Sequence, residues 1–296
     1  MTINRAHNNV YLEKMQTCRA GLAVLIHVNV HRVVYMKTET IVRLADYKPF
    51  PFEIVSVRLK FALDAHDALV TSTLHIKRKS EIEFTVPLVL DGDSLTLISV
   101  TLDGKAISTA DYFVAPDHFT MPAAPDDFVL EIVTKLNPAA NTALSGLYQS
   151  NGNWCTQCEA EGFRRITYYP DRPDVMSVFT VRLEAEKGAA PVLLANGNPV
   201  ESGELEGNGH FAIWHDPWPK PAYLFALVAG NLALSRDSFV TRSGRQVELG
   251  IYTEHGKEHL TLYAMDALKR SMKWDEEKYG CEYDLDVFNK IGKAHV

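Results

Sequence analysis

Cysteine is scarce in this sequence. Its 296 residues contain four cysteines, Cys18, Cys155, Cys158 and Cys281. Small secreted domains that depend on disulfides carry more cysteines at closer spacing. The sequence therefore excludes a disulfide framework and predicts a protein of a reducing compartment.

Long hydrophobic runs are also missing. The nearest approach is residues 20–26, far shorter than the roughly 18 to 20 apolar residues that span a bilayer. The polar residues His27, Asn29, His31 and Arg32 follow it, and no small-residue cleavage site of a signal peptide accompanies it. We therefore expect no membrane partner and a cytoplasmic location.

Positive charge is not in excess either. Lys and Arg number 30 against 37 Asp and Glu, which gives a formal net charge of −7. Nucleic acids and anionic membranes attract proteins of the opposite balance, so neither is an expected partner. What the sequence does have is 46% hydrophobic and 23% charged residues, the composition of a globular protein with a sizeable core in one large or two smaller domains.

Most of the chain carries the alternation that is typical of β-strands. In residues 55–63 every second residue is apolar, and residues 70–76 repeat the pattern, as a strand with one buried face does. Residues 223–229 form a continuous apolar run, which fits a strand covered on both faces. Many short strands at close spacing predict a mainly β fold with an antiparallel, sandwich-like or saddle-shaped domain.

Tight turns are expected at three dipeptides that lie between apolar stretches. Asp-Gly and Asn-Gly tolerate the positive φ that two-residue hairpins require. The three are Asp91-Gly92, Asp103-Gly104 and Asn196-Gly197.

Helical spacing appears only near the carboxyl end. Met265, Leu268 and Met272 lie three and four residues apart within residues 260–279, a segment of good helix formers that Gly280 follows. The spacing predicts one long helix with these three side chains on one face.

The motif Cys155-Thr156-Gln157-Cys158 has the spacing of a redox pair or of half a zinc site. A structural zinc needs four ligands, and the other two cysteines lie far away with no second paired spacing. A thioredoxin-like pair opens a helix in a βαβ unit, which this β-rich stretch does not offer. We therefore expect reduced cysteines with a structural use.

A second metal-like motif lies before the predicted helix. His255, Glu258 and His259 match the inverted zinc-protease pattern H-x-x-E-H. Gly256 disfavours a helix at the motif, and the downstream carboxylates at 276–277 would lie about 25 Å away along the helix, too far to complete a zinc site. Solvated charges at a helix start are the expected interpretation. More distant candidate ligands stay open: Glu204 and His215.

The most unusual composition lies in residues 146–150 and 155–174, where amides, carboxylates, arginines and tyrosines gather. Such a loop suits a ligand rim in which a carboxylate such as Glu159 pairs with a cationic group. It suits a structural network of Arg and Asp pairs equally well. The residue types alone leave both interpretations open.

A family resemblance is carried by GLYQS (146–150) and TQCEAEGFRRITYYPDRPDV (156–175). These stretches closely resemble the amino-terminal domain of the bacterial aminopeptidase N family, which are zinc-dependent gluzincin metallopeptidases, and the resemblance runs from about Met36 to Phe288. It implies that Glu159 binds the free α-amino group of a peptide and that Gln157 lines the pocket for the first side chain. A carboxylate in a partly dehydrated site is a natural partner for an ammonium group.

The resemblance also implies a domain organisation. Residues 1–35 are an unmatched extension, residues 36–231 are the amino-terminal β domain that caps the active site in the family, and residues 232–296 are the truncated start of a thermolysin-like catalytic domain, with strands and one helix. Because residues 1–35 and 289–296 depart from the family pattern, we expect a disrupted reading frame with an over-long start and a frameshift or premature stop near 289.

The zinc chemistry of the family depends on motifs that these residues lack. Neither G-x-M-E-N nor H-E-x-x-H occurs in the sequence, so the family's Lewis acid and general base have no counterpart. We expect no cofactor in this chain, weak binding of peptide N-termini through Gln157 and Glu159, and no hydrolysis by the chain alone.

Two other functions stay open. The chain could be a non-catalytic β-domain interaction module that self-associates through the unpaired surface of its catalytic-domain part, since exposed apolar area is adhesive. It could also be one half of a split aminopeptidase that another chain complements.

Overall fold

The computed structural model describes residues 43–82 and 85–292. The expectations for residues 1–35 and for residues 293–296 lie outside this part of the chain. The chain divides after Tyr47 into two units. Of the first unit, the described part holds one turn of 3-10 helix, Leu44–Asp46.

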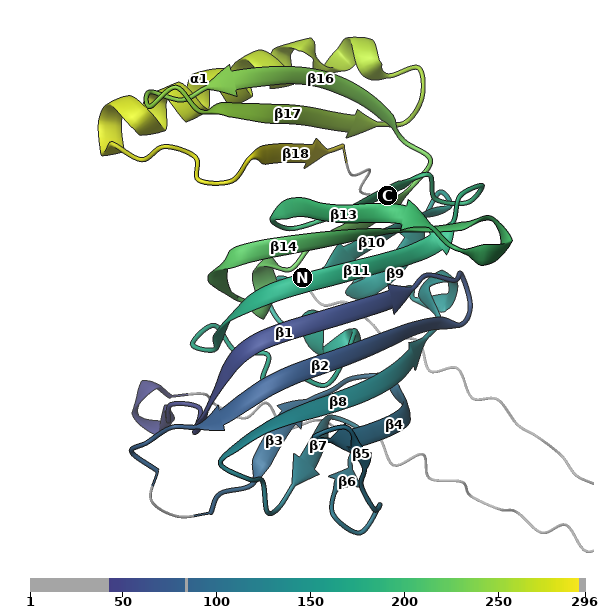
Figure 1. The fold of residues 1–296 in the computed structure, drawn as a ribbon, viewed down its shortest axis with the longest axis vertical. Coiled ribbons are helices and arrows are strands. Elements are labelled where there is room, and N and C mark those ends of the chain that lie inside the picture. The colour runs from purple at the N-terminus through teal and green to yellow at the C-terminus, as the bar shows by residue number, and fades with distance from the viewer. Residues whose placement is uncertain (1–42, 83–84, 293–296) are drawn as a thin grey trace, which may run out of the picture. The chain divides into compact units, whose positions relative to one another are not determined.

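The second unit is built almost entirely from β-strands (Figure 1). In chain order the strands are β1 (Phe52–Ala62), β2 (Ala68–Arg78), β3 (Leu88–Asp91), β4 (Thr96–Leu102), β5 (Lys105–Ala106), β6 (Phe113–Val114), β7 (His118–Met121), β8 (Asp127–Leu136), β9 (Gly146–Ser150), β10 (Asn153–Gln157), β11 (Met176–Glu186), β12 (Val192–Ala195), β13 (Asn198–Glu204), β14 (Gly209–Pro221), β15 (Leu227–Gly230), β16 (Ala233–Val240), β17 (Gln246–Thr253) and β18 (Val287–Ile291). Within the described residues the one α-helix is α1 (Leu262–Tyr279), and short 3-10 turns lie at Pro138–Ala140, Phe163–Arg165, Glu206–Asn208, Ala222–Leu224 and Glu258–Thr261. The prediction of a mainly β fold is confirmed.

Eight strands form the largest sheet, in the order β13-β14-β11-β1-β2-β8-β4-β5 (Figure 1). Neighbouring strands pair antiparallel, as predicted, with the exception of β1 and β11, which run parallel with Ser56 opposite Val178. A parallel pair needs a long crossover connection. Here the chain from β2 to β10 provides it, and the sequence pattern did not predict it.

The alternation predicted for residues 55–63 is present in β1 with one irregularity. Val57, Leu59 and Phe61 face the core and are at most 2% exposed. Ile54 is buried as well, because the pairing register with β2 shifts between Ile54 and Ser56. Val55 is thus the extra residue of a β-bulge, which lets apolar side chains on both sides of it face the same core.

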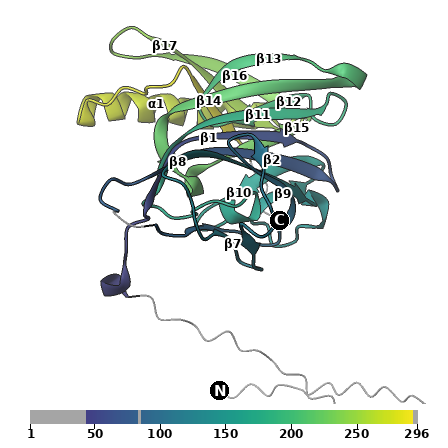
Figure 2. The same ribbon diagram turned by 60° about the horizontal axis from the view of Figure 1, so that its bottom comes forward.

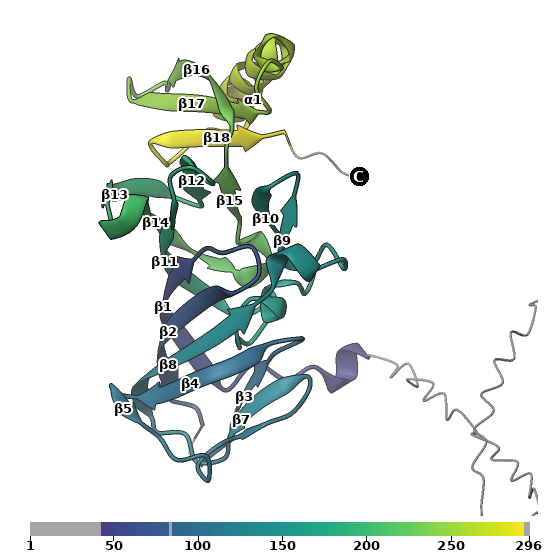
Figure 3. The same ribbon diagram turned by 90° about the vertical axis from the view of Figure 1, so that its right-hand side faces the viewer.

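Two smaller sheets lie on one side of the large sheet (Figure 3). They have the strand orders β12-β15-β10-β9 and β3-β7-β6, and Figure 2 shows the same layers from another direction.

Four aromatic rings pack in the core. The ring centroid of Phe163 lies 5.0 Å from that of Tyr169, 5.3 Å from that of Phe225 and 6.0 Å from that of Phe179. These edge-on contacts fix the segment that follows β10 against the large sheet.

The predicted hairpin turns are correct at one of three positions. Asp103-Gly104 joins β4 to β5, which pair antiparallel. The hairpins expected at Asp91-Gly92 and Asn196-Gly197 are wrong, because the strands before and after each dipeptide belong to different sheets. Gly92 is required for another reason, since a Cβ there would lie 2.3 Å from the ring of Tyr168.

The last part of the chain forms a three-stranded sheet covered by α1 (Figure 1). It has a hydrophobic core of its own, in which Val247, Leu249 and Ile251 of β17 meet Met265 and Met272 of α1, with Leu268 partly buried beside them. The predicted helix and its apolar face are therefore confirmed. Gly280 ends the helix in the left-handed conformation, with its N–H donating to the carbonyl of Glu276. No helix in the described residues is long and apolar enough to cross a membrane.

Alkaline pH is expected to weaken this fold in part through Tyr283. Burial, assisted by the nearby carboxylates of Asp284 and Asp216, raises the pKa of Tyr283 from 10.0 to about 12. Because the folded protein holds this proton more tightly than the unfolded chain, the contribution to stability is complete below pH 10.0 and is lost as the pH rises to about 12. Urea unfolding across this range should show a shallower loss of stability in Tyr283→Phe than in the wild type. Tyr263→Phe, on the exposed side of α1, is the matched control, and equal flattening in both variants would contradict the prediction.

Candidate functional site

The candidate site lies at the open end of the β9–β10 hairpin, on the side away from the turn that joins the two strands. Asn151 and Gly152 connect the two strands with positive φ values of 49° and 77°, as a two-residue hairpin turn requires. The register places Gly146 opposite Gln157. Trp154 anchors the hairpin in the β domain, because its ring N–H donates to the carbonyl of Asp64 and its backbone pairs with Ala229 of β15.

Gln157 and Glu159, the two predicted site residues, lie close together where β10 ends. The side-chain amide of Gln157 donates a hydrogen bond of 3.3 Å to the backbone carbonyl of Glu159. Gln157 is partly buried and Glu159 is exposed, and the Glu159–Ala160 peptide bond is cis. The structure thus places Gln157 at the end of β10 and Glu159 in the short loop that follows it, residues 158–162, which is referred to below as the Glu159 loop.

The carboxylate of Glu159 faces solvent without a protein cation beside it. Within residues 43–82 and 85–292 it forms no ion pair and accepts no hydrogen bond, whereas the neighbouring acidic residue Glu161 pairs with Arg164 at 3.4 Å. An exposed carboxylate that is not neutralised within the chain is available to a ligand cation.

Gly162 closes the Glu159 loop. Its N–H donates to the carbonyl of Cys158 at 2.8 Å. A Cβ at this position would lie 2.2 Å from the carbonyl oxygen of Gln157 and 2.9 Å from the Cα of Cys158. Only a residue without a side chain allows the two ends of the loop to approach this closely.

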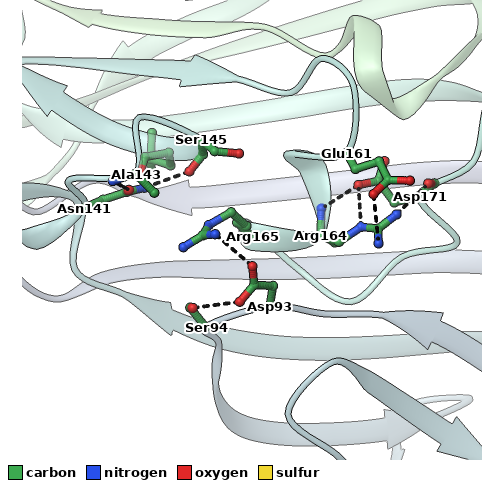
Figure 4. A network of polar contacts seen from close by, with 10 residues as sticks. Asp93, Ser94, Asn141, Ala143, Ser145, Glu161, Arg164, Arg165 and Asp171 are labelled. Carbon is green, nitrogen blue, oxygen red and sulfur yellow. Dashed lines mark hydrogen bonds and ion pairs between the residues drawn. The ribbon is translucent and has the colours of Figure 1, made fainter. Parts of the chain in front are cut away.

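Arg164 follows the loop and holds it to the β domain (Figure 4). Its Nε lies 3.2 Å from a carboxylate oxygen of Asp171, its Nη2 donates to the carbonyl of Asp171, and its backbone N–H donates to the same carboxylate. The Asp171 side chain is 2% exposed. Burial raises the pKa of the Asp171 carboxyl, and the hydrogen bonds from Arg164 oppose that shift. Asp171 and Arg164 therefore form a buried, charge-assisted pair.

A second pair in the same view joins Arg165 to the turn after β3 (Figure 4). The Nη1 of Arg165 lies 2.8 Å from a carboxylate oxygen of Asp93, and the Asp93 N–H donates to the carbonyl of Arg164. On the other side, the Asn141 amide donates to the carbonyls of Ser145 and Leu147, which fixes the start of β9. Both ends of the hairpin are thereby tied down by polar contacts.

The two interpretations of residues 155–174 that the sequence left open each describe a part of the segment. The arginines belong to a structural network, since Arg164, Arg165 and Arg172 all pair with aspartates. Glu159 instead projects to solvent. The sequence pointed to Glu159 and Gln157 through the resemblance, but it did not indicate that Arg164 and Asp171 hold the loop.

Of the two cysteines of the C-x-x-C motif, Cys155 lies within β10 and Cys158 directly follows the strand. Cys155 and Cys158 are buried and form no disulfide with each other. The motif does not open a helix, so its context differs from that of a thioredoxin-like pair.

The H-x-x-E-H residues do not converge. His255 lies in the turn after β17 and its ring contacts the amide oxygen of Asn231 at 2.9 Å, whereas Glu258 and His259 lie in the following 3-10 turn. Among the described residues no group of three or more His, Cys, Asp or Glu side chains could hold a metal ion.

Comparison with known proteins identifies relatives over most of the chain. The family described as Peptidase M1 N-terminal domain matches residues 53–224. Aminopeptidase N of Caulobacter vibrioides is 52% identical over 258 residues, covering 86% of this chain and 29% of that protein. Aminopeptidase N of Escherichia coli is 46% identical over 243 residues, covering 82% of this chain and 28% of that protein. The chain thus spans less than a third of the length of these curated relatives.

Solved structures give the same picture. Legionella pneumophila aminopeptidase A, in complex with aspartic acid, superposes with a TM-score of 0.80 and 32% identity, covering 84% of this chain and 30% of that chain. An M1 zinc metallopeptidase from Deinococcus radiodurans superposes with a TM-score of 0.67 at 16% identity, covering 81% of this chain and 56% of that chain. The second likeness concerns the fold alone.

Proposed function

Since this chain belongs to the M1 peptidase family through its amino-terminal domain, we propose that it supplies the part of an aminopeptidase site that recognises the free N-terminus of a peptide. The observation that carries the proposal is the Glu159 carboxylate, which is exposed at the end of a firmly anchored hairpin and unpaired within the described residues. Gln157 lies beside it and lines the space for the first side chain of the peptide.

The chemistry of such a site follows from charge. A peptide with a free N-terminus presents an ammonium group, and a carboxylate binds it through charge-assisted hydrogen bonds. A blocked N-terminus has neither the charge nor the three donors, so the same carboxylate discriminates against it. Because Glu159 faces water, the attraction is screened to about 1 kcal/mol, and binding by these residues alone is weak.

The proposal covers recognition of the peptide and not its hydrolysis. In the family a zinc ion acts as the Lewis acid, and its H-E-x-x-H ligands do not occur in this sequence. The role proposed for this chain is therefore recognition of the substrate.

The test is the binding of leucinamide, a cation with a free α-amino group, measured by NMR titration. Glu159→Gln removes the charge and keeps the size, so leucinamide binding should weaken about fivefold, which corresponds to about 1 kcal/mol. N-acetyl-leucinamide should bind no more tightly to the wild type than to the variant. Glu201→Gln, an exposed residue of β13, is the matched control. Equal leucinamide affinity in the wild type and in Glu159→Gln would refute the proposal.

The same polypeptide should not turn over an aminoacyl chromogenic substrate. Metal analysis and an assay on leucine p-nitroanilide are expected to give no stoichiometric zinc and no release of the chromophore. Turnover that a chelator abolishes would contradict this expectation and would direct attention to His255 and His259.

A second candidate function is one half of a complemented aminopeptidase. It is favoured by β18, which pairs with β17 on one side and has no strand on its other side among the described residues. A cavity of about 200 Å³ lies along β18 and is lined by residues of both of its faces, including Phe288 and Asn289, and by Leu194 and Val228 of the β domain. Mixing this chain with a polypeptide that carries the zinc helix should restore peptidase activity that neither has alone. If the mixture stays inactive and the chain dimerises in sedimentation, an interaction module is the better description.

A further inference from the structure

Arg164 connects the exposed Glu159 loop to a buried anchor. On the inner side it contacts Asp171 through its Nε, its Nη2 and its backbone N–H. Asp171 is itself tied to the β domain, because its N–H donates to the carboxylate of Asp91 at 3.0 Å. Asp91 in turn exchanges two backbone hydrogen bonds with Tyr169. Several independent contacts therefore fix the position of the Arg164 guanidinium group relative to the β domain.

On the outer side the same guanidinium reaches the loop. Its Nη1 lies 3.4 Å from a carboxylate oxygen of Glu161, two residues beyond Glu159. The Glu161 side chain is 68% exposed, so this contact lies at the surface while the Asp171 contact is buried. Arg164 thus bridges the buried Asp171 carboxylate and the exposed Glu161 carboxylate, with the carboxylate of Asp91 4.0 Å from the same Nη1. Its planar fork of donors allows such a bridge and a lysine does not.

This bridge also decides which carboxylate of the loop is available. Glu159 and Glu161 are both exposed acidic residues, but of these two Arg164 pairs only with Glu161. Glu159 is left as the loop carboxylate without a protein partner among the described residues. The arrangement gives the loop one binding charge rather than two.

We propose that Arg164 is a positioning residue for Glu159, acting through Glu161 and Asp171 to hold the Glu159 loop in a binding-competent conformation. This inference rests on the proposed amine-binding role of Glu159. Arg164 itself would not touch the ligand.

The test uses the full chain and the exchange rate of one backbone amide. The Gly162 N–H is hydrogen-bonded to the carbonyl of Cys158, so its exchange with deuterium reports opening of the loop. Glu161→Gln removes the exposed contact and leaves the buried Asp171 pair intact. Gly162 exchange should become about threefold faster at an unchanged melting temperature, because an exposed ion pair contributes little to global stability. In Arg164→Lys, which loses the fork to Asp171 as well, it should become at least about tenfold faster.

Two controls separate positioning from a general structural role. The Gly280 N–H, hydrogen-bonded to the Glu276 carbonyl at the end of α1, should exchange at the wild-type rate in Glu161→Gln. Glu204→Gln breaks an ion pair of similar exposure, 71%, with Lys187 and should leave Gly162 exchange unchanged. Unchanged Gly162 exchange in Glu161→Gln, or equal acceleration at Gly162 and Gly280, would overturn the inference.

The failure of this inference and that of the proposed function look different. If Glu159→Gln does not weaken leucinamide binding, the amine-binding role falls, whatever the exchange rates are. If Glu159→Gln weakens binding but Gly162 exchange is the same in Glu161→Gln and the wild type, the amine-binding role stands and the positioning role of Arg164 falls.

Discussion

Replacing Asp216 by alanine is expected to destabilise the protein by about 3–5 kcal/mol, the usual cost of leaving a buried charge without its partner. Lys220 is the residue left behind. Its Nζ lies 3.0 Å from a carboxylate oxygen of Asp216, and the two side chains are 9% and 11% exposed. The same Nζ lies 4.2 Å from the ring centroid of Phe179, within the aromatic core. Water cannot replace the lost carboxylate at such a position, so the charged form of Lys220 becomes costly.

The loss of folding stability predicted for Asp216→Ala should become smaller at alkaline pH. Burial lowers the pKa of Lys220 in the folded protein below its ordinary value of 10.5, and Asp216 opposes that shift. Without Asp216, the unfolded chain binds the proton more tightly than the folded protein does. The destabilisation should therefore shrink as the pH rises toward 10.5.

Urea-induced unfolding of Asp216→Ala and of the double variant Asp216→Ala, Lys220→Met provides the measurement. Removing both charges and filling the space with an apolar side chain should recover most of the stability, because a well-packed hydrophobic replacement of a buried pair is often neutral. A loss in Asp216→Ala that is below about 1 kcal/mol, or a double variant as unstable as the single one, would show that the pair is accessible to water.

Gly162→Ala is expected to destroy the candidate site and to destabilise the fold by about 1–3 kcal/mol, as overpacking does. The added Cβ would lie 2.2 Å from the carbonyl oxygen of Gln157 and 2.9 Å from the hydroxyl of Ser145. The first of these atoms belongs to the backbone and cannot rotate away. The hydrogen bond from the Gly162 N–H to Cys158 must then break, and the Glu159 loop opens.

Gly188→Ala is the matched control for this substitution. The nearest atom to a Cβ at Gly188 is a carboxylate oxygen of Glu186 at 3.6 Å, an ordinary contact distance. Thermal unfolding should separate the two variants, with Gly188→Ala within about 0.5 kcal/mol of the wild type. Leucinamide binding should be lost in Gly162→Ala and retained in Gly188→Ala. Retained binding in Gly162→Ala would mean that the loop conformation is not required.

The regular elements could be predicted because their periodicity is local. Alternate residues of β2 and the Met265, Leu268 and Met272 face of α1 follow directly from the spacing of apolar side chains. The bulge at Val55 could not be predicted, because a single extra residue leaves the apolar pattern on either side intact. The turn dipeptides misled at Asp91-Gly92 and Asn196-Gly197, since a glycine that permits close packing has the same sequence signature as one that closes a hairpin.

In the candidate site, too, local sequence indicated some of the residues, whereas only the fold shows their distant partners. Gln157 and Glu159 were indicated by the resemblance of a continuous stretch of sequence, and in the structure the Gln157 side chain at the end of β10 contacts the Glu159 carbonyl. The contact of Asp171 with Asp91 joins residues 80 positions apart, and that of Arg165 with Asp93 joins residues 72 positions apart. No local pattern indicates such partners, because the arginines and aspartates of this chain are numerous and their pairing is decided only by the fold.

The parallel pairing of β1 with β11 has a consequence for how the chain reaches its native state. During synthesis β1 leaves the ribosome long before β11. The edge of β1 that pairs with β11 in the folded protein therefore has no partner strand in the meantime. The core-facing ring of Phe61 also lacks a partner until Phe225 is made, whose ring centroid lies 6.0 Å away in the folded protein. Sheet closure over so long a sequence separation is slow, and a strand edge that stays open in the meantime favours aggregation of the newly made chain.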